Sequence, residues 1–181
     1  MRKANAVIAA LILVLFIIHG LLGAFQLTGA GAAPSVMRGL SYVMMLLIFL
    51  HAAIGIKYTA DSVRVARKTG APYFRENRLF WARRLSGFAI FLFLGLHVTA
   101  FSYSAEGALR LHAFDGFRLA AQLLLLISVA VHVITNVRPA LISFGIRKLK
   151  PRAADILFVL SVLLIIMGCS FLIYFFRWNA A

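Results

Sequence analysis

The stretch from Arg83 to His97, RRLSGFAIFLFLGLH, decides how this chain folds. Two fixed positive charges open the stretch, and the next titratable side chain is His97, thirteen residues after Arg84 and deep in apolar sequence. An ionisable side chain at such a depth is costly in a membrane, so it suggests a function by default, although a hydrogen-bonded neutral imidazole explains a single case. Three further histidines lie in similar apolar surroundings: His19, His51 and His132.

The whole chain is too apolar for a soluble domain. Of its 181 residues, 63% are hydrophobic, and only 19 basic and five acidic side chains are present. Uncharged runs that are long enough to cross a hydrocarbon core of about 30 Å occur at 4–37, 39–56, 85–105, 119–137 and 156–176. We therefore predict one all-α membrane domain over residues 1–181, with five transmembrane helices at about 6–27, 38–66, 78–104, 114–138 and 153–176.

The basic residues predict the orientation. With a cytoplasmic N-terminus, fifteen Lys and Arg residues lie on the inner side and four on the outer side, which is a strong positive-inside signal. We expect a multi-pass protein of the bacterial cytoplasmic (inner) membrane. The apolar core from Ala6 to Phe25 is longer than a usual signal-peptide core, so we expect it to stay as the first helix.

The net charge of +14 has a membrane explanation, because the basic residues lie at helix ends and in two inner loops. Topology and anionic headgroups of the lipid bilayer account for this placement, and no nucleic acid is expected as a partner. A docking surface for a cytoplasmic partner subunit on residues 57–84 is the open alternative.

The four histidines fall into two pairs by depth. His19 and His97 lie 14 and 13 residues from the inner ends of their helices at Asn5 and Arg84, roughly 20 Å up. His51 and His132 each lie six residues from a basic residue at the inner end, roughly 9 Å up. Each pair comes from two helices that run in the same direction.

Such helices are diagonal partners in an up-down four-helix bundle, so their side chains approach a common axis from opposite sides. Two bis-histidine haems b, an outer one on His19 and His97 and an inner one on His51 and His132, satisfy all four imidazoles. Zinc fits less well, because it normally takes three or four protein ligands, and no Cys, Asp or Glu lies nearby to complete either pair.

Haem propionates need cations or hydrogen-bond donors. For the inner haem the candidates are Lys57, Arg83, Arg84 and Arg138, whose other role is anchoring at the membrane interface. Near the outer ends, the available polar groups are Gln26, Ser104 and Gln122.

These features together resemble a known family. Five helices, one histidine on each of the first four, none on the fifth, and Arg-Leu-Ser-Gly at 84–87 look like the di-haem cytochrome b anchor of succinate dehydrogenases and fumarate reductases. The resemblance implies that the first and third helices hold the distal haem and the second and fourth the proximal one. It also implies an iron–sulfur subunit on the cytoplasmic face, a flavoprotein subunit with the dicarboxylate site, and a respiratory membrane quinone that exchanges electrons with the haems.

The chain departs from some relatives because its first four helices carry no carboxylate at mid-membrane depth. We therefore expect protons for the quinone reaction to enter from the outer loop through Glu106, His112 or Asp115, although a solvated loop residue is the simpler interpretation of each. An inner quinone site near Ser86, Arg83 and Trp81 is the alternative.

Two other functions stay open at this point. Cytochrome b subunits of formate dehydrogenases or hydrogenases typically take two haem ligands from one helix, whereas this chain has one histidine per helix. A non-redox membrane protein with structural histidines is the second. The chain has no Cys-x-x-Cys-His for covalent haem, and its lone cysteine, Cys169, is expected to pack within the fifth helix.

Overall fold

Five long helices make up most of the computed structural model, which describes residues 2–31, 36–70, 78–101, 103–105, 108–110, 112, 114–146 and 148–179. The helices are α1 (Arg2–Leu27), α2 (Val36–Thr69), α4 (Arg78–Phe101), α5 (Gly116–Ser143) and α6 (Leu149–Asn179). Each is long and apolar enough to cross a membrane. The prediction of an all-α, multi-pass membrane protein with five spans is therefore confirmed.

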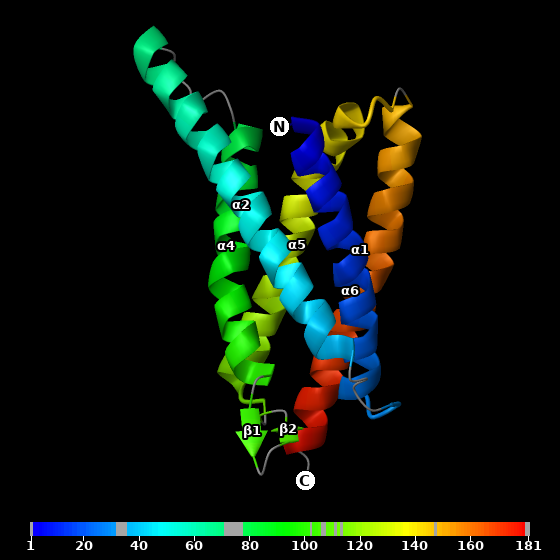
Figure 1. Ribbon diagram of the computed structural model, residues 1–181. Coiled ribbons are helices and arrows are strands. Elements are labelled where there is room, and N and C mark those ends of the chain that lie inside the picture. Colours follow the sequence, from blue (N-terminus) through cyan, green and yellow to red (C-terminus); the bar gives the residue numbers. More distant parts are fainter. Residues whose placement is uncertain are drawn as a thin grey trace.

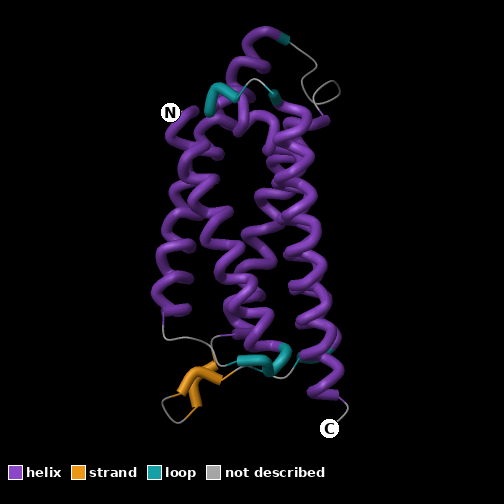
Figure 2. The backbone as a smooth tube through the Cα atoms, turned by 90° about the vertical axis from the view of Figure 1, so that its right-hand side faces the viewer, coloured by secondary structure: helices purple, strands orange, loops and turns teal. Residues whose placement is uncertain are grey.

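Successive helices run in opposite directions along one bundle axis (Figure 1). α4 packs against α5, α5 against α6, α6 against α1, and α1 against α2. Within the described residues, α1 makes no extensive contact with α4, nor does α2 with α5. The N-terminus lies at one end of the bundle, and the C-terminus and the small β-hairpin lie at the other end (Figures 1 and 2).

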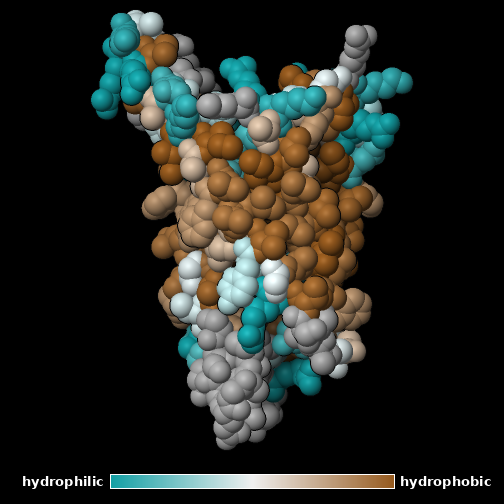
Figure 3. Space-filling view, in the orientation of Figure 1, coloured by the Kyte–Doolittle hydropathy of each residue, from teal (hydrophilic) through white to brown (hydrophobic). Residues whose placement is uncertain are grey.

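The outside of the bundle is apolar around its middle. Large exposed apolar side chains occur on all five helices, for example Val14, Phe49, Phe88, Ile127 and Ile165. In Figure 3 the hydrophobic surface forms a band, and hydrophilic residues gather toward the ends. This distribution suits a molecule whose surrounding solvent is the hydrocarbon of a bilayer.

Most helix ends lie within four residues of the sequence prediction, and two of the differences change the local structure. α4 ends at Phe101 rather than near residue 104, and the chain then forms a hairpin in which β1 (Tyr103–Ala105) pairs antiparallel with β2 (Ala108–Arg110). α5 continues through Pro139, where we had expected its end, and reaches Ser143. A proline removes one backbone donor without always stopping a helix, and α5 ends only where Gly145 takes a positive φ of 75°.

An aromatic cluster fixes the end of the bundle at which α1 and α4 finish. Leu27, Ala100, Phe114, Phe171 and Tyr174 are buried together, and they join α1, α4, the start of α5 and α6. The Tyr174 hydroxyl also donates a hydrogen bond to the backbone carbonyl of His112 (3.1 Å). This end of the molecule is therefore packed as in an ordinary protein core.

Gly20 lies where the Met167 side chain of α6 approaches α1. A Cβ placed on Gly20 would meet the end of the buried Met167 side chain, with its sulfur only 2.7 Å away. No atom lies within 4 Å of a Cβ placed on Gly95, which is exposed on α4. Gly20 thus allows a side chain of α6 to approach α1 next to His19.

We predict that Gly20→Val is less stable than the matched control Gly95→Val by about 1–3 kcal/mol, because only the first overpacks the interface with Met167. Both changes put the same β-branched residue into a helix, so intrinsic propensity cancels. Thermal unfolding in detergent measures the difference. Equal midpoints for the two variants would contradict the packing argument.

Candidate functional site

The structure brings the four apolar-run histidines together in two pairs, the same two that share a depth in the sequence. The ring centres of His19 on α1 and His97 on α4 lie 6.1 Å apart, with the ring planes at 65°. The ring centres of His51 on α2 and His132 on α5 also lie 6.1 Å apart, with the planes at 84°. Two levels of the bundle therefore carry the same facing arrangement of imidazoles.

The spacing within each pair fits a metal held between two imidazoles. Two nitrogen–metal bonds of about 2.0 Å, the length that imidazole makes to zinc, plus about 1.1 Å from each nitrogen to its ring centre, place the centres about 6.2 Å apart. The observed 6.1 Å in both pairs agrees with this sum. Among the described residues, no group of three or more His, Cys, Asp or Glu could hold a metal ion, so neither pair fits a zinc site.

All four histidines line one large, partly open cavity of about 2800 Å³, which extends along the bundle. Typical binding sites for small molecules occupy about 300–1000 Å³, so the cavity has room for more than one cofactor. Its walls are mainly apolar, with side chains such as Ile48, Phe91 and Leu94 between the two levels. Gly55 on α2 belongs to this lining, and nothing lies within 4 Å of a Cβ placed there.

Three of the four histidines form a hydrogen bond through Nδ1 with a side chain of a helix that is adjacent in the sequence, either between α1 and α2 or between α4 and α5. The contacts are His97 with Gln122 Oε1 (2.7 Å), His132 with Ser86 Oγ (3.1 Å) and His19 with Ser41 Oγ (3.2 Å). Nδ1 of His51 is buried and has no hydrogen-bond partner in the described part of the chain. A histidine that donates through Nδ1 keeps the lone pair of Nε2 for a metal.

The structure separates the four predicted propionate partners into two groups. Arg83 and Arg84 line the cavity, whereas Lys57 and Arg138 are exposed and do not belong to its lining. The Arg83 Nε donates to the carbonyl of Thr135 (2.9 Å), and the Arg84 guanidinium lies over the ring of Phe80 at 4.8 Å. Two guanidinium groups are thus held at the end of the cavity where α4 begins.

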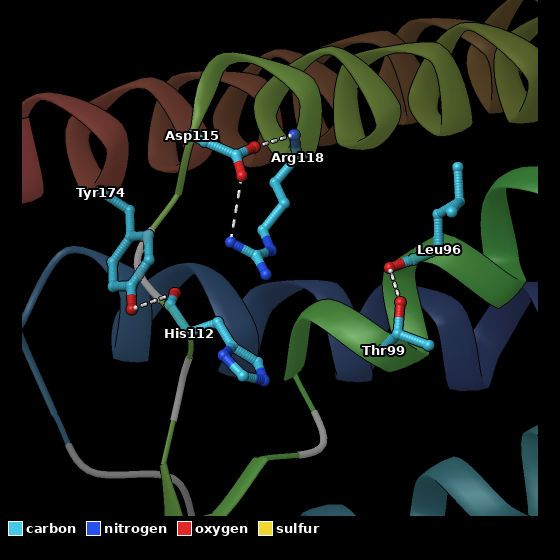
Figure 4. Close-up of polar contacts among 6 residues, drawn as sticks. All are labelled: Leu96, Thr99, His112, Asp115, Arg118 and Tyr174. Atoms are coloured by element: carbon cyan, nitrogen blue, oxygen red, sulfur yellow. Dashed lines mark hydrogen bonds and ion pairs between the residues drawn. The ribbon is translucent and has the colours of Figure 1, made fainter.

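The outer-loop candidates lie outside this cavity. Asp115 precedes α5 and accepts a hydrogen bond from the backbone nitrogen of Arg118 (2.7 Å) and one from its guanidinium (3.1 Å), as Figure 4 shows. His112 is half-buried and is joined to Tyr174 through its backbone carbonyl (Figure 4). Glu106 lies outside the described residues.

A separate small cavity of about 160 Å³ borders Asp115, Arg118, Leu96 and Thr99. This volume is below the roughly 300 Å³ of typical small-molecule sites. Asp115 has a structural role instead, because its side chain is the N-cap of α5. Ser86 also has a structural role, because its hydroxyl is the hydrogen-bond partner of His132.

The contact of Ser41 with His19 was not predicted from the sequence. The predicted site residues were titratable side chains, Ser86 and a few polar groups near the outer helix ends. Gln122, expected near the outer haem, contacts His97, which is a predicted ligand of that haem. A search for hydroxyl and amide side chains at the same depth as each histidine would have indicated Ser41, because it lies near the outer end of α2 as His19 does in α1.

No family of known proteins, curated protein or solved structure matches the chain.

We predict that Asp115→Ala lowers the stability of the protein by about 1 kcal/mol, because the first turn of α5 loses its capping acceptor. The exposed ion pair with Arg118 adds little to this value. Asp115→Asn is the matched control, since an asparagine side chain still accepts from the backbone nitrogen. Unfolding in detergent should show a lower midpoint for the alanine variant only. An equal loss in both variants would mean that the carboxylate charge, rather than the cap, is what matters.

Proposed function

We propose that this chain is the di-haem cytochrome b membrane anchor of a succinate:quinone oxidoreductase, the class that contains succinate dehydrogenases and fumarate reductases. The observation that carries the proposal is the pair of facing imidazoles, 6.1 Å between ring centres, that recurs at two levels of one cavity. A histidine with a purely structural role needs a polar neighbour but does not need to face a second imidazole. Two haems b would explain why the imidazoles face each other in pairs.

His19 and His97 hold the outer haem in this proposal, and His51 and His132 hold the inner one. The bound groups supply one-electron transfer between the two faces of the membrane. The chain itself binds them through Nε2 of each histidine and surrounds them with apolar side chains that exclude water. Arg83 and Arg84 are well placed to neutralise propionates at the inner end, since both line the cavity.

The proposed partners follow from the charge distribution. α2 extends past Lys57 to Thr69 and carries Arg64, Arg67 and Lys68 at the end of the bundle that also holds the N-terminus (Figure 1). With that end in the cytoplasm of a bacterium, an iron–sulfur subunit docks there and connects the anchor to a flavoprotein subunit that binds the dicarboxylate. This chain contributes electron transfer and the reaction with a membrane quinone.

One haem ligand on each of four helices favours this class over the cytochrome b subunits of formate dehydrogenases and hydrogenases. Those proteins typically take two ligands from a single helix. Here every pair joins two helices that make no extensive direct contact, α1 with α4 and α2 with α5.

We predict that the purified protein contains two haems b per chain. Dithionite reduction should produce a b-type α-band in the visible spectrum, and extraction of the pigment with pyridine should give a haem-to-protein ratio of two. Acid acetone should remove all of the colour, because the chain has no Cys-x-x-Cys-His motif for covalent attachment. A colourless protein purified from cells supplied with haem would sink the proposal.

The pairing predicts which variants lose the same haem. His19→Ala and His97→Ala should each remove the outer haem, and His51→Ala and His132→Ala should each remove the inner one, so each variant retains about one haem per chain. Potentiometric titration identifies the remaining component. His112→Ala is the matched control, because it removes an imidazole that does not line the cavity, and it should keep both haems. If His19→Ala and His51→Ala retained the same component, the assignment of the pairs would be wrong.

A further inference from the structure

Gln122 is the most completely buried polar side chain in the described part of the molecule. Its exposed fraction is 0%, although it lies on α5 within a span that faces hydrocarbon. Its amide oxygen accepts the short hydrogen bond of 2.7 Å from Nδ1 of His97, and its amide nitrogen has no partner among the described residues. Burying an amide whose nitrogen makes no hydrogen bond costs free energy. A functional role for the bond to His97 would explain why this costly residue is present.

The direction of this hydrogen bond fixes the tautomer of His97. A side-chain amide oxygen can only accept, so Nδ1 of His97 carries the proton and Nε2 carries the lone pair. Ser41 acts on the opposite histidine, His19, in a weaker way. Its hydroxyl donates to the carbonyl of Met37 at 2.8 Å, so its oxygen accepts from Nδ1 of His19 at 3.2 Å.

We propose that Gln122 is a positioning residue that holds His97 as the Nδ1–H tautomer and strengthens its Nε2 as an electron donor to the outer haem. This inference rests on the proposed function. A buried acceptor on Nδ1–H raises the basicity of a metal-bound imidazole, and a more basic axial ligand stabilises ferric over ferrous iron. Gln122 therefore lowers the reduction potential of the outer haem, which sets it apart from the inner one.

The inner pair is held by different polar contacts, among them the backbone carbonyl of Arg83 beside His132. Ser86 is the only side chain that bonds a ring nitrogen of that pair in the described residues, at 3.1 Å, and it also lies 3.2 Å from the carbonyl of Arg83. Its single proton serves one of these two acceptors, so it does not force one tautomer on His132 as an amide oxygen does. Among the described residues, Nδ1 of His51 has no hydrogen-bond partner. The chain thus supports its two proposed haem sites with different kinds of acceptor.

Two substitutions at one position separate positioning from packing. Gln122→Met keeps the length of the side chain but removes the acceptor, whereas Gln122→Glu keeps an acceptor at the same place. We expect Gln122→Met to raise the midpoint potential of the component that His97→Ala abolishes, and to leave the other component unchanged. Gln122→Glu should give a potential at or below that of the unmodified protein. Ser128→Ala is the matched control, because Ser128 is a buried residue of α5 whose hydroxyl bonds only to Leu124 of its own helix.

Redox titration of the purified protein, followed in the visible spectrum, gives both midpoints in one experiment. If Gln122→Met loses the outer haem altogether while Gln122→Glu retains it, the acceptor role is again supported. An unchanged outer potential in Gln122→Met, an equal shift of both components, or the same shift in the Met and Glu variants would overturn the proposal. In each of these cases the haems are present, so failure of this inference is distinct from failure of the proposed function, which would show as unmodified protein without haem.

Discussion

The structure depends on one constraint, which is that four imidazoles inside a bilayer must have polar partners. Hydrocarbon offers no hydrogen bonds, so each ring has to be satisfied by a neighbouring helix or by a bound group. Three of the four follow one pattern: Nδ1 of His19, His97 and His132 bonds to a side chain of the adjacent antiparallel helix, and each ring lies opposite a histidine across the cavity. His51 has only the second contact among the described residues. The hydrogen bonds connect helices that are neighbours in the chain, whereas the facing rings connect helices that are not.

Five membrane spans were predictable because a window of 18 or more apolar residues has few stable alternatives to a transmembrane helix. The histidine pairs were also accessible, since a rise of 1.5 Å per residue converts sequence position into depth. The continuation of α5 past Pro139 and the hairpin after Phe101 were not predictable from hydropathy. Both occur at the ends of the apolar runs, where side-chain bonds and turn geometry, rather than apolarity, determine where a helix stops.

The same limit applied to the site. Depth identifies which histidines can meet, but it does not give the rotation of each helix about its axis. Rotation decides that Ser41 faces His19 and that Gln122 lies beside His97, while Lys57 and Arg138 are exposed. With 63% hydrophobic residues, most helix faces are apolar all round, so the sequence holds little periodic signal from which to read that rotation.

The packing pattern gives the proposed haems a structural role as well as an electronic one. α1 and α2 form one antiparallel hairpin and α4 and α5 form another, each with its own extensive interface. α6 joins α1 to α5, yet α2 has no extensive contact with α4, α5 or α6 in the described residues. Every histidine pair links one hairpin to the other, and α2 takes part through His51, as well as through the contact of Phe49 with Phe91 of α4. Histidine ligation of a haem at both levels would therefore connect the two hairpins where direct helix contacts are few. Binding of the cofactors and assembly of the bundle would then be coupled. The two histidine–iron bonds proposed for each haem would then have two effects: they would hold the redox centre in place, and they would join the two helix hairpins.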